Sequence, residues 1–253
     1  MNMIGLVRNE WKKVFLPVLL TTVLLAIAMS ILSCTIYQTY SLQYDLEAWE
    51  VGTELFSMFY PLLVVIPLCW NLYYERKNNF LLYVMPRVNI QKYLTAKWIA
   101  YALGTLCIIV VPYVLSAVFA LYIKPPVVPF TLNKFYHIFQ TVFIENPLLY
   151  AVAISCWRGL VGILVMTFGF VLALYRKNIF VILTGPFMYS ILENFVLSTL
   201  RLESYRLVVS FDPTVVNPQV VSIFSFLVGP IVLGIVIGLT AFLLSKKNAV
   251  VTI

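Results

Sequence analysis

The stretch Trp98–Ile123 reads WIAYALGTLCIIVVPYVLSAVFALYI and contains no charged residue. An α-helix rises about 1.5 Å per residue and the hydrocarbon core of a bilayer is about 30 Å thick, so about 20 apolar residues can cross it. The run is continuously apolar, whereas a transmembrane β-strand would alternate polar and apolar residues. This stretch therefore predicts an all-α integral membrane protein.

Five further runs are similarly long and apolar, and the whole chain of 253 residues is 62% hydrophobic and 11% charged. We therefore expect one transmembrane domain over residues 1–253, with no room for a soluble catalytic domain. The first run is longer than a signal-peptide core and has no small-residue cleavage site, so we expect it to be retained. The predicted spans are 15–37, 55–72, 98–123, 148–175, 179–200 and 221–245.

Basic residues predict the orientation of these spans, because cytoplasmic loops carry an excess of Lys and Arg. They gather before the first span, in residues 75–97, after the fourth span and in the tail, whereas most acids, Asp212 included, fall on the opposite side. Both termini are thus expected to be cytoplasmic. The net charge of +7 is then a topology signal, and no nucleic-acid partner is expected.

Two segments outside the spans have a predicted structure of their own. Residues 1–14 favour an amphipathic entry helix in the membrane interface, ended or kinked by Pro17. Residues 201–219 contain Asp212-Pro213 and Asn217-Pro218 among apolar side chains. A loop this apolar is expected to re-enter the membrane under the shelter of the protein.

Arg158 and Glu193 are the charges deepest inside the predicted spans. They lie about 27 Å and 24 Å from the short turn that joins spans four and five, so they are expected at similar depth, where they could pair. An intramembrane charge is costly unless it is paired or wet. The sequence leaves open whether this pair is a structural salt bridge or the polar lining of a transport path.

The hypothesis that the chain is an enzyme has little support in the sequence. The four cysteines show no short metal-binding spacing, His137 is the only histidine, and there is no His-Glu-x-x-His pattern. Neither Gly-Lys-Ser nor Gly-Lys-Thr occurs, so the chain has no Walker A element with which to hydrolyse ATP. We expect no catalytic residue, cofactor or metal in this chain.

Residues 75–97 form the most polar stretch between two spans. A short helix over residues 78–85 would have an apolar face, and Pro86 would end it because proline disfavours helix before it and lacks an N–H. This helix could contact a cytoplasmic partner, or it could be an interfacial turn without one. The apolar face consists of Phe80, Leu81 and Val84.

The sequence ERKNNFLLYVMPR at residues 75–87, continuing to Gln91–Lys97, resembles the loop after the second span of ABC-2-type permeases. The stretch RNEWKK at residues 8–13 looks like the entry helix of that family, and LSKKN at residues 244–248 resembles its usual ending. One departure is that Arg87 directly follows Pro86, where the family often interposes small residues.

The resemblance implies an ABC-2 (type V) exporter-like fold in a plasma membrane, with a bacterial cytoplasmic membrane expected. It implies two copies of a cytoplasmic ABC ATPase that bind ATP and Mg, and a second permease copy or close paralogue meeting this chain along spans one and five. The residues implied to couple to the ATPase are Glu75, Arg76, Asn79, Phe80, Leu81, Val84, Pro86 and Arg87.

The expected function is outward movement of amphipathic or hydrophobic peptides, because compact six-span permeases resemble exporters of toxin peptides and bacteriocins. The aromatic content of 15% suits such a substrate, but it suits a lipid or hydrophobic drug equally well. An ATP-independent channel or secondary transporter is a further alternative, which predicts broken helices near the midplane of the membrane.

Overall fold

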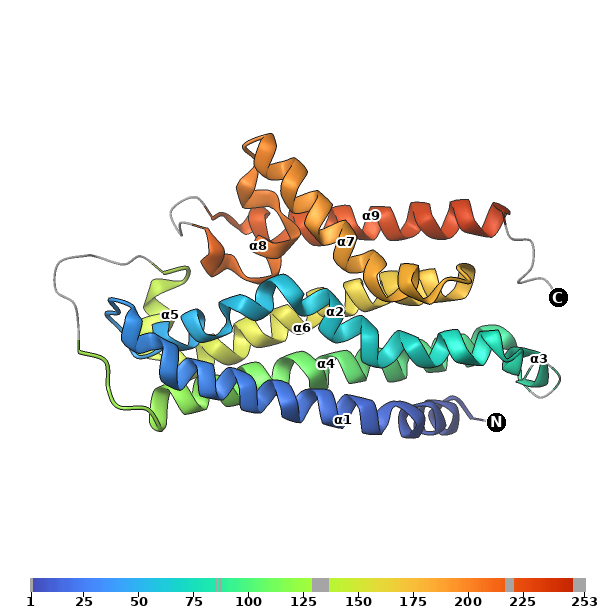
Figure 1. Ribbon diagram of the computed structural model, residues 1–253, viewed down its shortest axis with the longest axis horizontal. Helices are drawn as coiled ribbons and strands as arrows, with labels where there is room; N and C mark the ends of the chain where they lie inside the picture. The colour runs from blue at the N-terminus through green and yellow to red at the C-terminus, as the bar shows by residue number, and fades with distance from the viewer. Residues whose placement is uncertain (1, 85, 87, 129–136, 217–220, 248–253) are drawn as a thin grey trace.

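A computed structural model of the protein describes residues 2–84, 86, 88–128, 137–216 and 221–247 (Figure 1). Within these ranges the chain forms helices and no strand. The six long helices are α1 (Met3–Thr35), α2 (Glu47–Lys77), α4 (Ile90–Tyr122), α6 (Pro147–Tyr175), α7 (Ile179–Thr199) and α9 (Ile223–Lys247). Each is long and apolar enough to span a membrane, as the sequence predicts, and the described chain is all-α.

Short elements join the long helices. The α-helical ones are α3 (Phe80–Val84), α5 (Gln140–Glu145) and α8 (Leu207–Phe211). The 3-10 helices are η1 (Ile36–Thr39), η2 (Glu203–Tyr205) and η3 (Pro213–Val215). The segment after α7 is thus η2, α8 and η3, and its predicted continuation over residues 217–219 lies outside the described residues.

The predicted entry helix over residues 1–14 is the first part of α1, so Pro17 does not end the helix there. Pro17 lies inside α1. The helix continues because its buried side chains, Leu6 and Val14 before Pro17 and Val18 after it, form one face. Packing against α4 along that face compensates for the hydrogen bond that proline removes.

Four helices form the compact part of the molecule. α1 packs along α4 and α2, and α6 packs against α4 and α2 on the other side (Figure 1). α1 and α2 approach closely at Gly52, where a Cβ atom would overlap the backbone of Ser33. Large aromatic side chains fill the interior between these helices, among them Trp49, Tyr60, Tyr101 and Tyr113.

α7 and α9 lie at the side of this group and are much less covered. In the most apolar window of each helix, 17% of the residues of α7 and 22% of those of α9 are buried, against 50% in α6. α8 packs against α9, α6 and α7 and so fills the space beside them. Gly229 of α9 permits this contact, because a Cβ there would lie 2.9 Å from Cα of Leu207.

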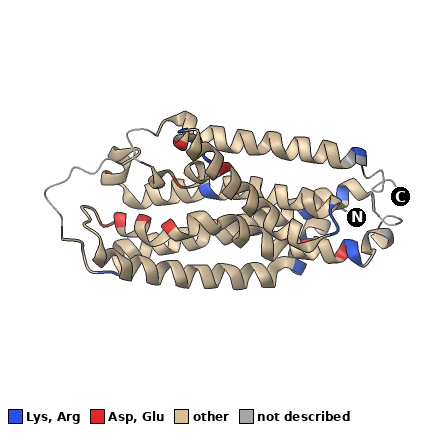
Figure 2. Ribbon diagram, turned by 45° about the horizontal axis from the view of Figure 1, so that its top comes forward, with Lys and Arg blue, Asp and Glu red and all other residues tan. Residues whose placement is uncertain are grey.

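The two ends of the bundle differ in their short elements. The start of α1, the helix α3 and the end of α9 lie together at one end, and α5 lies at the other (Figure 1). We call these the α3 end and the α5 end. Lys and Arg gather at the α3 end, whereas a row of acidic residues lies towards the α5 end (Figure 2).

Candidate functional site

A short helix lies where the sequence predicts one, but it covers Phe80–Val84 instead of residues 78–85. α2 continues to Lys77, Asn78 caps it, and Asn79 has a positive φ of 54°. Asparagine tolerates this left-handed conformation, which interrupts the helix before α3 begins at Phe80. α3 ends at Val84, Pro86 follows it, and Met85 and Arg87 lie outside the described residues.

The side chains of α3 divide into two groups. Phe80 and Tyr83 are 39% and 73% exposed, whereas Leu81 and Val84 are partly buried. The α3 end therefore presents aromatic side chains on its surface. Arg76, just before this helix, instead donates a hydrogen bond of 2.8 Å to the carbonyl of Ala173 and so joins α2 to the end of α6.

Glu75 belongs to a buried group of charges that we call the α3-end cluster. Its members are Glu10 and Lys13 of α1, Glu75 of α2, and Tyr93 and Lys97 of α4. Nζ of Lys97 lies 2.7 Å from Oε2 of Glu10 and 2.6 Å from Oε2 of Glu75. The Lys97 side chain is fully buried, so these two carboxylates supply the compensation that a buried ammonium requires.

Lys13 completes the charge balance of the cluster. Its Nζ lies 2.5 Å from Glu10 and 3.0 Å from Glu75, and the hydroxyl of Tyr93 donates to Glu75 at 2.9 Å. Lys13 also lies 5.0 Å from the ring centroid of Phe80, a cation–π contact with α3. The cluster therefore joins the ends of α1, α2 and α4 directly behind α3.

Arg158 is a fully buried charge of α6, and Glu193, the partner that the sequence suggests, is not the residue with which it pairs. Its Nη2 lies 2.8 Å from Oδ1 of Asp212, with both side chains fully buried, and it does not pair with Glu193. Glu193 instead accepts a hydrogen bond from the backbone N–H of Leu207. The reason is that α8 packs against both α6 and α7, which places its C-terminal neighbour Asp212 beside Arg158.

Aromatic rings enclose this pair, and we call the group the Arg158 cluster. The guanidinium carbon lies 4.4 Å from the ring centroid of Tyr113 and 4.9 Å from that of Trp49. Phe211 stacks on Tyr60 with centroids 3.8 Å apart. An arginine among rings gains cation–π attraction, which offsets part of its desolvation.

Asp212 receives several donors besides Arg158. Ser57 donates to its Oδ2 at 2.5 Å and the Thr214 hydroxyl to its Oδ1 at 2.6 Å. Burial by itself would raise the pKa of Asp212, but Arg158 and these donors hold that pKa below its ordinary value. The segment from α8 to η3 is thus anchored to α2 and α6 through one carboxylate.

His137, the only histidine, lies at the α5 end beside two acids of α2. Its Nε2 is 2.8 Å from Glu47 and its Nδ1 is 3.6 Å from Glu50, and its ring stacks on Phe143. The described part of the chain contains no group of three or more metal-ligating side chains arranged to hold an ion. We therefore assign this histidine a structural contact between α2 and the segment before α5.

In each cluster one residue, Glu75 or Arg158, could be identified from the sequence as a candidate functional residue, but its partners could not. Glu75 was expected to contact an ATPase, yet its carboxylate is 10% exposed and faces Lys97 and Lys13. The i, i+3 spacing of Glu10 and Lys13 was a usable signal, because residues so placed share a helix face. Asp212 could have been found as an acid in an otherwise apolar segment.

No family model, no curated protein and no solved structure matches the chain. Evidence for a function therefore comes from the geometry of the α3 end and the α5 end.

Proposed function

We propose that this chain is the membrane subunit of an ATP-driven exporter of the ABC-2 type. The observation that carries the proposal is α3, a short helix between two spanning helices at the end rich in Lys and Arg. It presents Phe80 and Tyr83 outwards and lies against the α3-end cluster. Exposed aromatic side chains are typical anchors of protein–protein interfaces.

In this proposal a cytoplasmic ABC ATPase binds α3, and two copies serve a pair of permease chains. ATP and Mg are bound by the ATPase, because the present chain has no phosphate-binding motif of its own. The α3-end cluster supports the mechanism: Lys13 contacts Phe80 and also the carboxylates of α1 and α2. Displacement of α3 would thereby pull on three helix ends at once.

The proposed substrate is an amphipathic or hydrophobic peptide moved out of the cell, with a lipid or hydrophobic drug as the alternative. The weakly covered helices α7 and α9 support a substrate that arrives through the bilayer. A second permease copy, identical or closely related, would cover part of the exposed apolar surface of α1 and α7, for example Leu24 and Phe195.

The test is purification of the tagged full-length chain from its source cells, followed by identification of a co-purifying ATPase by its Walker A sequence and by ATP hydrolysis. We expect Phe80→Ala with Tyr83→Ala to abolish this association. Tyr122→Ala is the matched control, because Tyr122 is 69% exposed and lies at the opposite end of α4 from α3. Transport by the purified chain alone in ATP-free vesicles would contradict the proposal and favour a channel or secondary transporter.

A further inference from the structure

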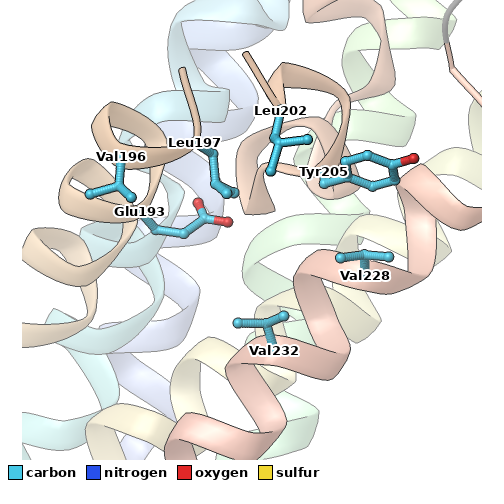
Figure 3. A pocket seen from close by; sticks show the side chains of 7 residues that line it. All are labelled: Glu193, Val196, Leu197, Leu202, Tyr205, Val228 and Val232. Carbon is cyan, nitrogen blue, oxygen red and sulfur yellow. The ribbon is translucent and has the colours of Figure 1, made fainter. Parts of the chain in front are cut away.

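Two cavities of the molecule differ in size and in the chemistry of their walls. The larger, of about 440 Å³, lies between α7, η2 and α9, and Figure 3 shows valine and leucine side chains around it. Its accessible lining is apolar. The smaller, of about 10 Å³, lies between α1, α2 and α4, and Tyr60 and Tyr113 form part of its wall. The smaller cavity therefore adjoins two side chains that can form hydrogen bonds.

The hydroxyl groups of these two tyrosines are buried, and neither has a hydrogen-bond partner among the described residues. Tyr60 and Tyr113 are each 2% exposed, and both rings pack against Phe211. In native proteins the large majority of buried polar side-chain atoms have a partner, which is either a protein group or an ordered water molecule. Two buried hydroxyls at one cavity thus point to a small ligand that bonds to both of them.

A proline frees a third polar group in the wall of the same cavity. Pro112 has no N–H to donate to the carbonyl of Ile108, which lies four residues before it in α4. Ile108 is 1% exposed and lines the cavity. Ordered water is one of the groups that can satisfy a carbonyl freed in this way within a membrane-spanning helix. α4 therefore supplies a hydrogen-bond acceptor as well as the hydroxyl of Tyr113.

The size of the cavity limits the ligand to a single water molecule. A cavity needs about 10–15 Å³ to hold one water molecule, together with two to four polar partners. The volume of about 10 Å³ meets the first requirement at its lower limit. Two hydroxyls and one carbonyl meet the second. The other lining side chains, among them Val64 and Ile109, are apolar and offer no partner to a larger polar ligand.

We propose that this cavity binds one water molecule between α2 and α4. The hydroxyls of Tyr60 and Tyr113 each donate a hydrogen bond to the water oxygen, and the water donates one to the carbonyl of Ile108. The water thereby links two helices within the Arg158 cluster, since Tyr113 also contacts the guanidinium. The site is formed by this chain alone and does not depend on an ATPase partner.

The direct test is an experimental structure of the full-length protein by electron cryomicroscopy, at a resolution that shows ordered water. We expect one water molecule at about 2.5–3.0 Å from the hydroxyl oxygen of each tyrosine, the range for O–H···O hydrogen bonds. Well-ordered tyrosines with no water density beside their hydroxyls would overturn the proposal. A direct hydrogen bond between the two hydroxyls would also overturn it.

Thermal unfolding in detergent tests the same water through its effect on stability. Tyr60→Phe and Tyr113→Phe each remove one hydrogen bond to the water, so each should lower the unfolding temperature by about 2–4 °C. The double variant should lower it by less than the sum of the two single effects, because the two hydroxyls share one partner.

Tyr122→Phe is the matched control, because Tyr122 lies on the same helix as Tyr113 but is 69% exposed, and its unfolding temperature should match that of the wild type. An unpaired buried hydroxyl costs free energy, so its removal from a dry cavity would leave the unfolding temperature unchanged or raise it. That result for both folded single variants would overturn the proposal. The wild-type structure decides the question even if neither variant folds.

Discussion

The α3-end cluster and the Arg158 cluster both place charges inside an apolar helical bundle, but they join different kinds of elements. The α3-end cluster brings together four charges from the ends of three long helices, and Lys13 remains 35% exposed. The Arg158 cluster is a single pair with both side chains fully buried. It joins a long helix, α6, to the short segment from α8 to η3.

The largest effect is expected at Arg158. Arg158→Ala leaves the buried carboxylate of Asp212 without its cation, and breaking a buried pair in this way costs about 3–5 kcal/mol. We expect a correspondingly lower free energy of unfolding in detergent, measured by chemical denaturation. Replacing both partners, with Arg158→Met and Asp212→Leu, should recover much of the loss because no unpaired charge remains.

Arg201→Ala is the matched control, because Arg201 is exposed, and its effect should stay within about 0.5 kcal/mol. If Arg158→Ala is no more harmful than this control, the pair with Asp212 does not anchor the segment from α8 to η3.

A smaller loss of stability is expected at Lys97, because a second cation lies in the same cluster. Lys97→Met removes the buried cation between Glu10 and Glu75, but Lys13 still faces both carboxylates. The cost should therefore fall to about 2 kcal/mol, below the range for breaking an isolated buried pair. Thermal unfolding in detergent would measure it, with Lys92→Met as the exposed control on the same helix. A loss equal to that of Arg158→Ala would show that Lys13 does not compensate.

The smallest effect is expected at Asp45, whose pair with Lys124 is partly exposed. Burial would raise the pKa of Asp45, but Lys124 at 2.6 Å and the N–H of Val127 lower it below its ordinary value. The stabilisation is therefore complete above the unfolded pKa of about 3.9 and is lost as the pH falls through the lower folded value.

The Asp45 side chain is 43% exposed, so the pair is worth no more than about 1 kcal/mol. The difference in unfolding temperature between the wild type and Asp45→Asn should shrink as the pH falls from about 6 towards about 3, because this range includes the ordinary carboxyl pKa of about 3.9. A difference that stays constant over this range would exclude the ion pair as its origin.

Most of the helical architecture could be predicted from the sequence, because the length of an apolar run reports directly on its ability to cross a bilayer. The six apolar helices have local signals, whereas the helix predicted over residues 78–85 runs through Asn79, where the structure has a break. The helix ends were less predictable. α2 begins at Glu47 and α4 at Ile90, since a helix can extend beyond the hydrocarbon region where its polar side chains find partners.

The pairing of charges could not be predicted in the same way. Arg158 and Glu193 were expected at similar depth on neighbouring helices, but depth does not specify the direction in which a side chain points. Asp212 is 54 residues from Arg158 along the chain, and only the return of α8 towards α6 brings them together. Lys97 likewise reaches Glu10 because α1 packs along α4.

The sequence by itself determined that the chain has six helices long and apolar enough to cross a membrane, because the length and hydropathy of each run are local properties. The tertiary structure decided which charges neutralise one another and that Glu193 accepts from the backbone N–H of Leu207. These outcomes depend on contacts between distant segments, since a buried charge is stabilised by whichever group the packing brings within hydrogen-bond distance.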